Sequence, residues 1–253
     1  MPSPRPAISV VIPTRNRHAM LAEAIGSVLR QDWRDHEIVV VDDGEGAADF
    51  LARRFAQTPA IRCADNRHSG QVRARNLGVS LARGDIVAFL DDDDLWGSPA
   101  YLGAVRAAIA GDNAASVASG EIVTIDGDLK PIETIPFAAR TDPQSIRADN
   151  KILVSGFAFA RTLSERLGPF DEIMPIYWDW DWYLRLHEAG VVFHDLGPQD
   201  VKIRVHAEAT SRPDQSELRR QDLGRLSAKH GLGPLTLRNH ESIARDEATG
   251  EPA

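Results

Sequence analysis

The chain has 253 residues, enough for one large α/β domain or two small ones, and its composition of 43% hydrophobic and 26% charged residues is typical of a globular protein. Its formal net charge of −8 argues against nonspecific binding to nucleic acid, which needs clustered positive charge. The single cysteine, Cys63, excludes an internal disulfide and a cysteine-based zinc site. Neither a signal-peptide pattern nor an apolar run of membrane-spanning length occurs, so we expect a cytoplasmic protein without a membrane span.

Strands and helices alternate along the first ninety residues. Short apolar runs predict strands at residues 7–12, 37–41, 61–64 and 86–90. Apolar residues at helical spacing predict helices at residues 19–30, 47–56 and 71–82. This alternation with short connections predicts a mostly parallel, doubly wound α/β sheet with helices on both faces. The carboxyl ends of all four strands would then lie at one edge.

The pattern loosens in the rest of the chain. We expect helices at residues 100–110, 181–189 and 214–230, and strands at 115–118, 121–125, 155–160, 191–194 and 201–205. Residues 132–150 are expected to be mostly irregular, and the chain beyond His240 to be frayed. Because no repeat or low-complexity linker separates these parts, we expect one domain over residues 1–253. It would comprise a first half at 1–97, a second half with a smaller mixed sheet at 98–212, and a C-terminal helix and tail at 213–253.

Four consecutive aspartates, Asp91 to Asp94, follow the last apolar strand of the first half. In an open α/β sheet, ligands bind beyond the carboxyl ends of the strands. Clustered carboxylates repel one another unless a cation or hydrogen-bond donors compensate, and hard divalent ions prefer oxygen ligands. The tetrad therefore indicates a site for Mg²⁺ or Mn²⁺, and the simpler alternative is a solvated acidic turn.

Other strand ends and one helix start also carry polar groups. The first strand runs into Pro13, Thr14 and Arg15, and the second ends next to Asp43, whose carboxylate can accept hydrogen bonds from a ribose hydroxyl or a base N–H. Arg75 lies near the start of a predicted helix, where guanidinium and backbone N–H groups can meet phosphate. A turn with local hydrogen bonds explains residues 13–17 without any ligand.

Four motifs stand in order along the first hundred residues: VVIPTRN from Val10, VVDDG from Val40, ARNLG from Ala74 and FLDDDD from Phe89. In this order and spacing they resemble the family 2 glycosyltransferases of GT-A fold. The resemblance implies inverting transfer of a sugar from a nucleoside diphosphate sugar to an acceptor hydroxyl, with Mn²⁺ or Mg²⁺. Residues 1–97 would bind the nucleotide sugar, for which UDP- and dTDP-sugars are both expected. Residues 98–212 would bind the acceptor, which would be a saccharide, a lipid or a small metabolite.

The resemblance also implies roles for individual residues. It assigns the metal to Asp93 and to His206, the latter from the late element Arg204-Val205-His206. It assigns the nucleotide sugar to Pro13, Thr14, Arg15, Asp43, Arg75, Asp91 and Asp92. It assigns the catalytic base to Asp179, with Trp178 where the family usually has glutamate, and with Asp181 as the fallback.

Simpler or rival interpretations stay open for some of these features. Asp179 lies near a predicted helix start and could only cap that helix, and a lone histidine such as His206 is more often structural. A sugar-1-phosphate nucleotidyltransferase is disfavoured, because it would need a glycine-rich loop after the first strand and residues 13–17 contain no glycine. Trp178 suggests a further alternative, a catalytically weak homologue that binds nucleotide sugars as a binding or scaffold protein.

Overall fold

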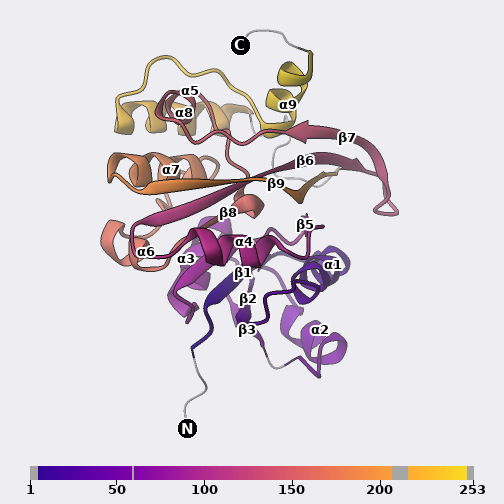
Figure 1. The fold of residues 1–253 in the computed structure, drawn as a ribbon. Helices are drawn as coiled ribbons and strands as arrows, with labels where there is room; N and C mark the ends of the chain where they lie inside the picture. The colour runs from indigo at the N-terminus through magenta and orange to yellow at the C-terminus, as the bar shows by residue number, and fades with distance from the viewer. Residues whose placement is uncertain (1–4, 59, 207–215, 250–253) are drawn as a thin grey trace.

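The computed structural model describes residues 5–58, 60–206 and 216–249, and nine strands of this part form one sheet (Figure 1). The strands are β1 Ile8–Thr14, β2 His36–Asp42, β3 Ile61–Asp65, β4 Ile86–Phe89, β5 Leu95–Trp96, β6 Ala114–Ile125, β7 Pro131–Phe137, β8 Phe157–Ala160 and β9 Val192–Val205. Their order across the sheet is β3-β2-β1-β4-β8-β6-β9-β5, and β7 pairs with β6. The predicted α/β class is confirmed.

The strands of the first half are parallel, as the sequence predicts. Thr14 of β1 lies opposite Asp42 of β2, which in turn lies opposite Asp65 of β3. On the other side of β1, Val11 lies opposite Phe89 of β4. Because parallel strands point the same way, the polar segments that follow β1, β2 and β4 leave the sheet at one edge.

The strands of the second half continue this sheet. β8 runs antiparallel to β4 and β6, β9 runs parallel to β6, and β5 and β7 pair antiparallel with β9 and β6. The mixed strands expected on the acceptor side are therefore joined to the parallel strands through β8. One sheet thus spans both halves of the chain.

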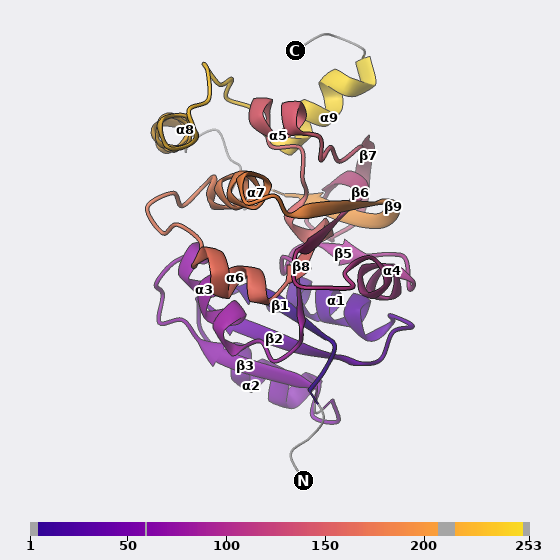
Figure 2. The same cartoon turned by 60° about the vertical axis from the view of Figure 1, so that its left-hand side comes forward.

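Helices cover the sheet on both sides. They are α1 His18–Leu29, α2 Ala47–Arg54, α3 Gln71–Leu81, α4 Tyr101–Ala108, α5 Pro143–Ala148, α6 Thr162–Leu167, α7 Trp178–Glu188, α8 Ser216–His230 and α9 His240–Thr249, with a 3₁₀ turn, η1, at Val154–Gly156. Figures 1 and 2 show α1 and α3 on opposite sides of β1, and α7 over β6 and β9 with α5 and α8 beyond it. No helix in the described part of the chain is both long and apolar enough to cross a membrane.

Gly78 lets α3 approach the sheet closely. A Cβ atom at this position would lie 2.3 Å from Cγ1 of Val11 and 3.3 Å from Cγ2 of Val41. A real side chain does not tolerate the shorter distance, so only glycine allows this packing. Helix α3, which carries Arg75, is thereby held close to β1 and β2.

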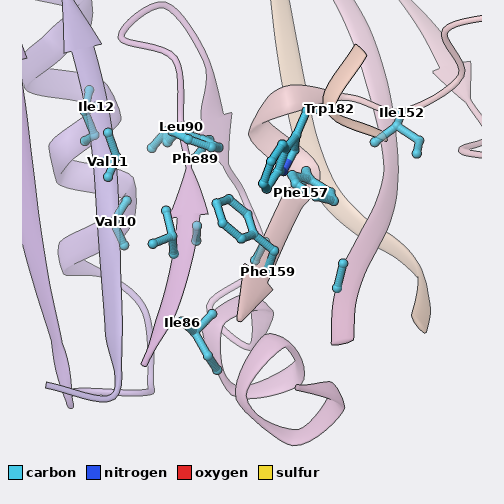
Figure 3. Packing of buried hydrophobic residues seen from close by; sticks show 14 of the residues in the cluster. Val10, Val11, Ile12, Ile86, Phe89, Leu90, Ile152, Phe157, Phe159 and Trp182 are labelled. Atoms are coloured by element: carbon cyan, nitrogen blue, oxygen red, sulfur yellow. The ribbon is translucent and has the colours of Figure 1, made fainter. Parts of the chain in front are cut away.

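A continuous apolar core joins the sheet to α7 (Figure 3). Residues 10–12 of β1 are buried next to β4, and Phe89 of β4 packs against Phe159 of β8, with ring centroids 6.1 Å apart. Phe159 meets Trp182 of α7 edge to face, with centroids 5.4 Å apart. Burial of large aromatic side chains is among the strongest stabilising contributions in a core. Helix α7 is thus held firmly over the sheet.

Several elements differ from the sequence predictions. The strands expected at 115–118 and 121–125 form one strand, β6, and those expected at 191–194 and 201–205 form one strand, β9, because the two long strands pair with each other. Helix α7 begins at Trp178 rather than at residue 181, and β5 and α6 were not predicted. Residues 132–150, expected to be mostly irregular, contain β7 and α5.

The tail prediction is wrong for the described residues beyond His240, which form α9. This helix buries Ile243 and Ala244 in a second apolar cluster, with Ile135 and Phe137 of β7. Strand β7 and helix α9 each bury only two residues, so each depends on packing against the other rather than on its own local pattern. Residues 214 and 215 of the last expected helix and residues 250–253 of the tail lie outside the described residues.

Candidate active site

The polar segments that follow β1, β2 and β4 contact one another directly. The backbone N–H of Asp43 donates to the carbonyl of Thr14 over 2.8 Å. The Thr14 hydroxyl donates to Oδ2 of Asp92 over 2.6 Å. The structure therefore brings together the strand ends that the sequence pointed to.

Asp92 is completely buried and is surrounded by donors of the chain itself. Besides Thr14, Arg17 binds both of its oxygens, with Nη2 2.5 Å from Oδ1 and Nε 3.2 Å from Oδ2. Burial raises the pKa of Asp92 to about 6, although Arg17 opposes this rise. Asp92 therefore links the acidic segment to the segment between β1 and α1, and its predicted contribution to sugar binding would be indirect.

Asp93 and Asp94 have contrasting environments. Burial opposes ionisation of Asp93, but the hydrogen bond with His206 and the charge of Arg17 outweigh it and lower the pKa of Asp93. Its Oδ2 lies 3.0 Å from Nε2 of His206 and 2.6 Å from Nη1 of Arg17. Asp94 accepts from the Ser155 hydroxyl over 2.6 Å and from the backbone N–H of Arg204 over 2.9 Å. Burial, together with the neighbouring carboxylates, raises the pKa of Asp94 well above its ordinary value.

Asp91, Asp93 and Asp94 form a possible metal-binding group. Each offers one carboxylate oxygen, and these oxygens lie within 4.8 Å of one another. Hard divalent cations prefer such oxygen ligands. Of the two predicted metal residues, Asp93 belongs to this group, and His206 contacts it through Asp93.

A cavity of about 210 Å³ extends from the acidic group towards α7, α8 and α9. Asp91, Asp93 and Asp94 line it together with Arg75. Asp179 also lines it, as do residues from the start of α7 and from the segment before α9. The predicted base and the predicted metal site thus face one space.

Asp179 is 5% exposed and lies in the first turn of α7. Its Oδ2 accepts from Nδ2 of Asn150 over 2.9 Å, and its Oδ1 accepts from the backbone N–H of Trp180 over 2.8 Å. Burial raises the pKa of Asp179 to about 6, although the hydrogen bond from Asn150 opposes the rise. A carboxylate whose pKa lies near neutrality suits proton transfer.

Asp181 faces a different environment and does not line the cavity. Although burial alone would raise its pKa, hydrogen bonds from His230 and Lys229 and the charge of Arg185 lower it. Its Oδ1 lies 2.8 Å from Nε2 of His230 and 2.7 Å from Nζ of Lys229. These contacts make Asp181 an anchor between α7 and α8, so Asp179 is the better candidate for the base.

Trp178 is buried and packs against Arg75. The Arg75 guanidinium carbon lies 4.6 Å from the centroid of the Trp178 ring, and Arg75 also forms an ion pair with Asp91. Phe170 meets the same indole edge to face at 4.9 Å. Trp178, which stands where the resemblance expects glutamate, thus stacks against a cation. The next residue, Asp179, still lines the cavity.

The remaining predicted sugar-nucleotide residues lie at the same sheet edge but outside the cavity wall. Oδ1 of Asp43 accepts from Nδ2 of Asn66 over 2.6 Å and from the backbone N–H of Gly70 over 2.9 Å. Pro13 is buried, whereas Arg15 is exposed. Asp43 therefore connects the ends of β1 and β2 to the segment that leads into α3.

The structure adds residues that the sequence did not single out. Asp94 joins the acidic group, and Arg17 and Arg204 hold it. Asp94 and Arg204 lie inside recognised motifs and Arg17 directly follows one, so their position in the sequence was a signal. Asn150 and His240, which line the far end of the cavity, lie in segments expected to be irregular or frayed. Nothing in the local sequence marked these two.

A model of the family described as glycosyl transferase family 2 matches residues 9–164. The chain belongs to this family. It is 33% identical over 236 residues to the uncharacterized glycosyltransferase YwdF of Bacillus subtilis, a match that covers 92% of this chain and 87% of the relative. It is 32% identical over 186 residues to the uncharacterized glycosyltransferase alr2836 of Nostoc, covering 68% of this chain and 55% of that relative. The chain is thus a glycosyltransferase.

Solved structures share the fold at lower identity. The mannosyltransferase PcManGT from Pyrobaculum calidifontis, in complex with GDP-Man and Mn²⁺, has a TM-score of 0.66 at 20% identity, covering 98% of this chain and 70% of its own. Residues 1–349 of S. aureus TarS, in complex with UDP-GlcNAc, give a TM-score of 0.63 at 18% identity, covering 87% of this chain and 66% of theirs. These similarities support the GT-A fold that the sequence implied.

Proposed function

We propose that this glycosyltransferase is metal dependent and inverting, and that it moves a sugar from a nucleoside diphosphate sugar to an acceptor hydroxyl. One observation carries the proposal: the buried carboxylate of Asp179 and the group of Asp91, Asp93 and Asp94 line the same cavity. Inverting transfer needs a base for the acceptor and a separate site for the departing diphosphate. The cavity offers both.

The acidic group suits Mn²⁺ or Mg²⁺, because its three carboxylates converge and hard cations prefer oxygen ligands. We propose that Asp93 is the principal ligand, with Asp91 and Asp94 beside it and His206 at the rim. When bound, the cation would neutralise negative charge on the donor diphosphate. The presence of Mn²⁺ in the PcManGT complex supports this choice.

Asp179 would act on the acceptor. It takes the proton of the acceptor hydroxyl while that oxygen forms a bond to the anomeric carbon of the donor. The bond from the anomeric carbon to the diphosphate oxygen breaks, and the nucleoside diphosphate leaves with the electron pair. Because burial raises the pKa of Asp179 only to about 6, this carboxylate is mostly ionised at neutral pH. It is then ready to accept the proton.

The strand ends would hold the nucleotide. We propose that Pro13, Thr14, Arg15 and Asp43 contact the base and ribose, and that the Arg75 guanidinium binds the diphosphate. Asp91 would support this contact through its ion pair with Arg75, and the buried Asp92 would contribute indirectly, through Thr14 and Arg17. UDP- and dTDP-sugars remain the expected donors, and the UDP-GlcNAc complex of TarS supports uridine. GDP-sugars belong in the same test because PcManGT binds GDP-Man.

Release of nucleoside diphosphate from UDP-, dTDP- and GDP-sugars tests the proposal. Metal-stripped protein should release little, and Mn²⁺ or Mg²⁺ should restore release. The Asp179→Asn variant should keep donor affinity and lose turnover by about 10²–10⁴-fold. Glycosyl transfer at an undiminished rate without divalent metal would contradict the metal requirement. A donor that raises the melting temperature but is never turned over would favour the binding or scaffold alternative.

A further inference from the structure

The acceptor end of the cavity contains an amide that the motifs do not include. We propose that Asn150 is a positioning residue, which aims the Asp179 carboxylate and accepts a hydrogen bond from a second hydroxyl of a polyhydroxylated acceptor, a saccharide. This inference rests on the proposed function, since it assumes that Asp179 is the base.

Of the two polar atoms of the Asn150 side chain, one has a hydrogen-bond partner and the other has none among the described residues. Its Nδ2 donates to Oδ2 of Asp179 over 2.9 Å, and the residue is only 8% exposed. A carboxylate oxygen is an acceptor, so the NH₂ end of the amide must face Asp179. Oδ1 is shielded from solvent and has no hydrogen-bond partner among the described residues. Asn150 lines the cavity, and a buried oxygen without a partner carries a free-energy cost that a ligand donor would relieve.

The backbone of Asn150 is held from the C-terminal part of the chain. Its N–H donates to Oδ1 of Asp149 over 2.9 Å, and Nη1 of Arg238 binds the other oxygen of Asp149 at 2.9 Å. Arg238 is itself fixed by Asp246 of α9 at 2.5 Å. The ring of His240 also hydrogen bonds to the backbone of Asn150. A functional group held this way stays in one orientation, which is what aiming a base requires.

The available groups indicate the chemistry of the acceptor. Oδ1 of an asparagine only accepts, so the acceptor must present a donor beside the attacked hydroxyl. Burial lowers the pKa of His240 to about 4, so its ring is neutral near pH 7. Its Nε2, shielded and without a partner in the described part of the chain, is a further acceptor at the cavity wall. Two neutral acceptors beside a carboxylate fit a ligand with several hydroxyl groups, as in a saccharide.

The first test measures the pKa of Asp179 without any substrate. Aspartate labelled with ¹³C at the carboxyl carbon is titrated by NMR in the wild type and in Asn150→Ala, and the Asp179 signal is identified by its loss in Asp179→Asn. Because the hydrogen bond from Asn150 favours the ionised form, its removal should raise the pKa of Asp179 above its value of about 6. The control is Asn113→Ala, which removes an exposed amide that bonds to Gly190 and Arg166. An unchanged pKa in Asn150→Ala would overturn the positioning role.

The second test uses methyl glycosides of the common hexoses as acceptors, followed by the monodeoxy analogues of any glycoside that is turned over. Loss of the hydroxyl next to the attacked one should lower kcat/KM of the wild type by roughly three- to tenfold, the value of one neutral hydrogen bond. In Asn150→Ala, kcat/KM should be the same for the glycoside and its deoxy analogue. In Asn113→Ala, the deoxy analogue should lower kcat/KM as much as in the wild type. An equal deoxy penalty in Asn150→Ala, or turnover of none of the glycosides, would overturn the saccharide assignment. Full activity of Asp179→Asn would instead refute the proposed function itself.

Discussion

The guanidinium of Arg75 lies over the indole of Trp178 and pairs at the same time with the carboxylate of Asp91. Arg75 comes from α3, Asp91 follows β4, and Trp178 begins α7. A single side chain thus connects the acidic group with the helix that carries the candidate base.

Replacing Arg75 by lysine should lower kcat/KM for the donor by roughly tenfold, because lysine keeps the charge but loses the planar fork and the stacked contact. Steady-state kinetics checks this. Arg73→Lys is the matched control, since Arg73 is 59% exposed and pairs with Glu172 on the surface. Equal kcat/KM values for the two lysine variants would show that the contacts of Arg75 with Trp178 and Asp91 do not contribute to activity.

Asp93→Asn should weaken Mn²⁺ binding by more than about tenfold, since even residues that only support metal ligands contribute about 10–100-fold. Titration calorimetry on the metal-stripped protein measures this directly. Asp128→Asn, which changes a carboxylate that is 80% exposed in the turn between β6 and β7, should bind Mn²⁺ as the wild type does. Equal affinities of the Asp93→Asn variant and the wild type would remove Asp93 from the metal site.

Asp43→Ala should weaken binding of the free nucleoside diphosphate. A hydrogen bond to a charged acceptor contributes about 1.5–3 kcal/mol, so we expect roughly tenfold or greater weakening. Asp49→Ala, at an exposed position of the nearby helix α2, is the control. Calorimetry with UDP, dTDP and GDP provides the measurement, and unchanged affinity for all three would show that Asp43 only links the strand ends.

Turnover should depend on pH through Asp179. The base must be ionised to accept a proton, and burial raises the pKa of Asp179 to about 6, so kcat should fall as the pH drops through about 6. The residual activity of Asp179→Asn should not show this fall in kcat on the acidic side of the pH profile. Asp181→Asn should keep it, because Asp181 points to His230 and Lys229 instead of the cavity. An acidic limb that disappears only in Asp181→Asn would transfer the role of base to Asp181.

The contact between Asp181 and His230 should also make stability depend on pH. Burial disfavours protonation of His230, but hydrogen bonds with Asp181 and Glu188 outweigh it and raise its pKa above 6.5. Protonated His230 therefore stabilises the folded state fully below pH 6.5, and this contribution is lost as the pH rises through the folded pKa. Two basic side chains also face these carboxylates: Arg147 lies 4.0 Å from Glu188, and Lys229 lies 2.7 Å from Asp181.

Melting temperatures of the wild type and of His230→Gln, measured from pH 5.5 to 9, check this expectation. The difference between the two proteins should be largest at the acidic end and should shrink towards the alkaline end. A difference that grows with pH would mean that His230 is held neutral in the folded protein.

The parts of the site that the sequence predicted are those fixed by local pattern. Apolar runs locate β1, β2 and β4, and parallel pairing then requires Thr14, Asp43 and the aspartates after β4 to gather at one edge. Which aspartate faces the cavity was not predictable, since the irregular chain after β4 has no fixed side-chain period. Only the structure shows that Asp92 pairs with Arg17 and that Asp94 belongs to the acidic group.

The contacts at the proposed acceptor end of the cavity could not be predicted from the sequence, for a different reason. Asn150 meets Asp179 only because α5 and α7 pack together, with the indole N–H of Trp180 donating to the carbonyl of Ile146. Likewise, α9 and β7 become ordered through each other across a long stretch of sequence. Such contacts depend on the tertiary fold, and neither residue spacing nor composition reports them.

If the proposed role of Asn150 holds, the contacts that fix this residue imply that donor and acceptor preferences can change independently. Arg238, His240 and Asp246, which hold the asparagine, lie beyond residues 9–164 that match the family model. The aspartates of the acidic group lie within those residues. If Asn150 positions the acceptor as we propose, exchanging residues 238–246 for those of a relative should change the acceptor preference and leave the donor preference the same.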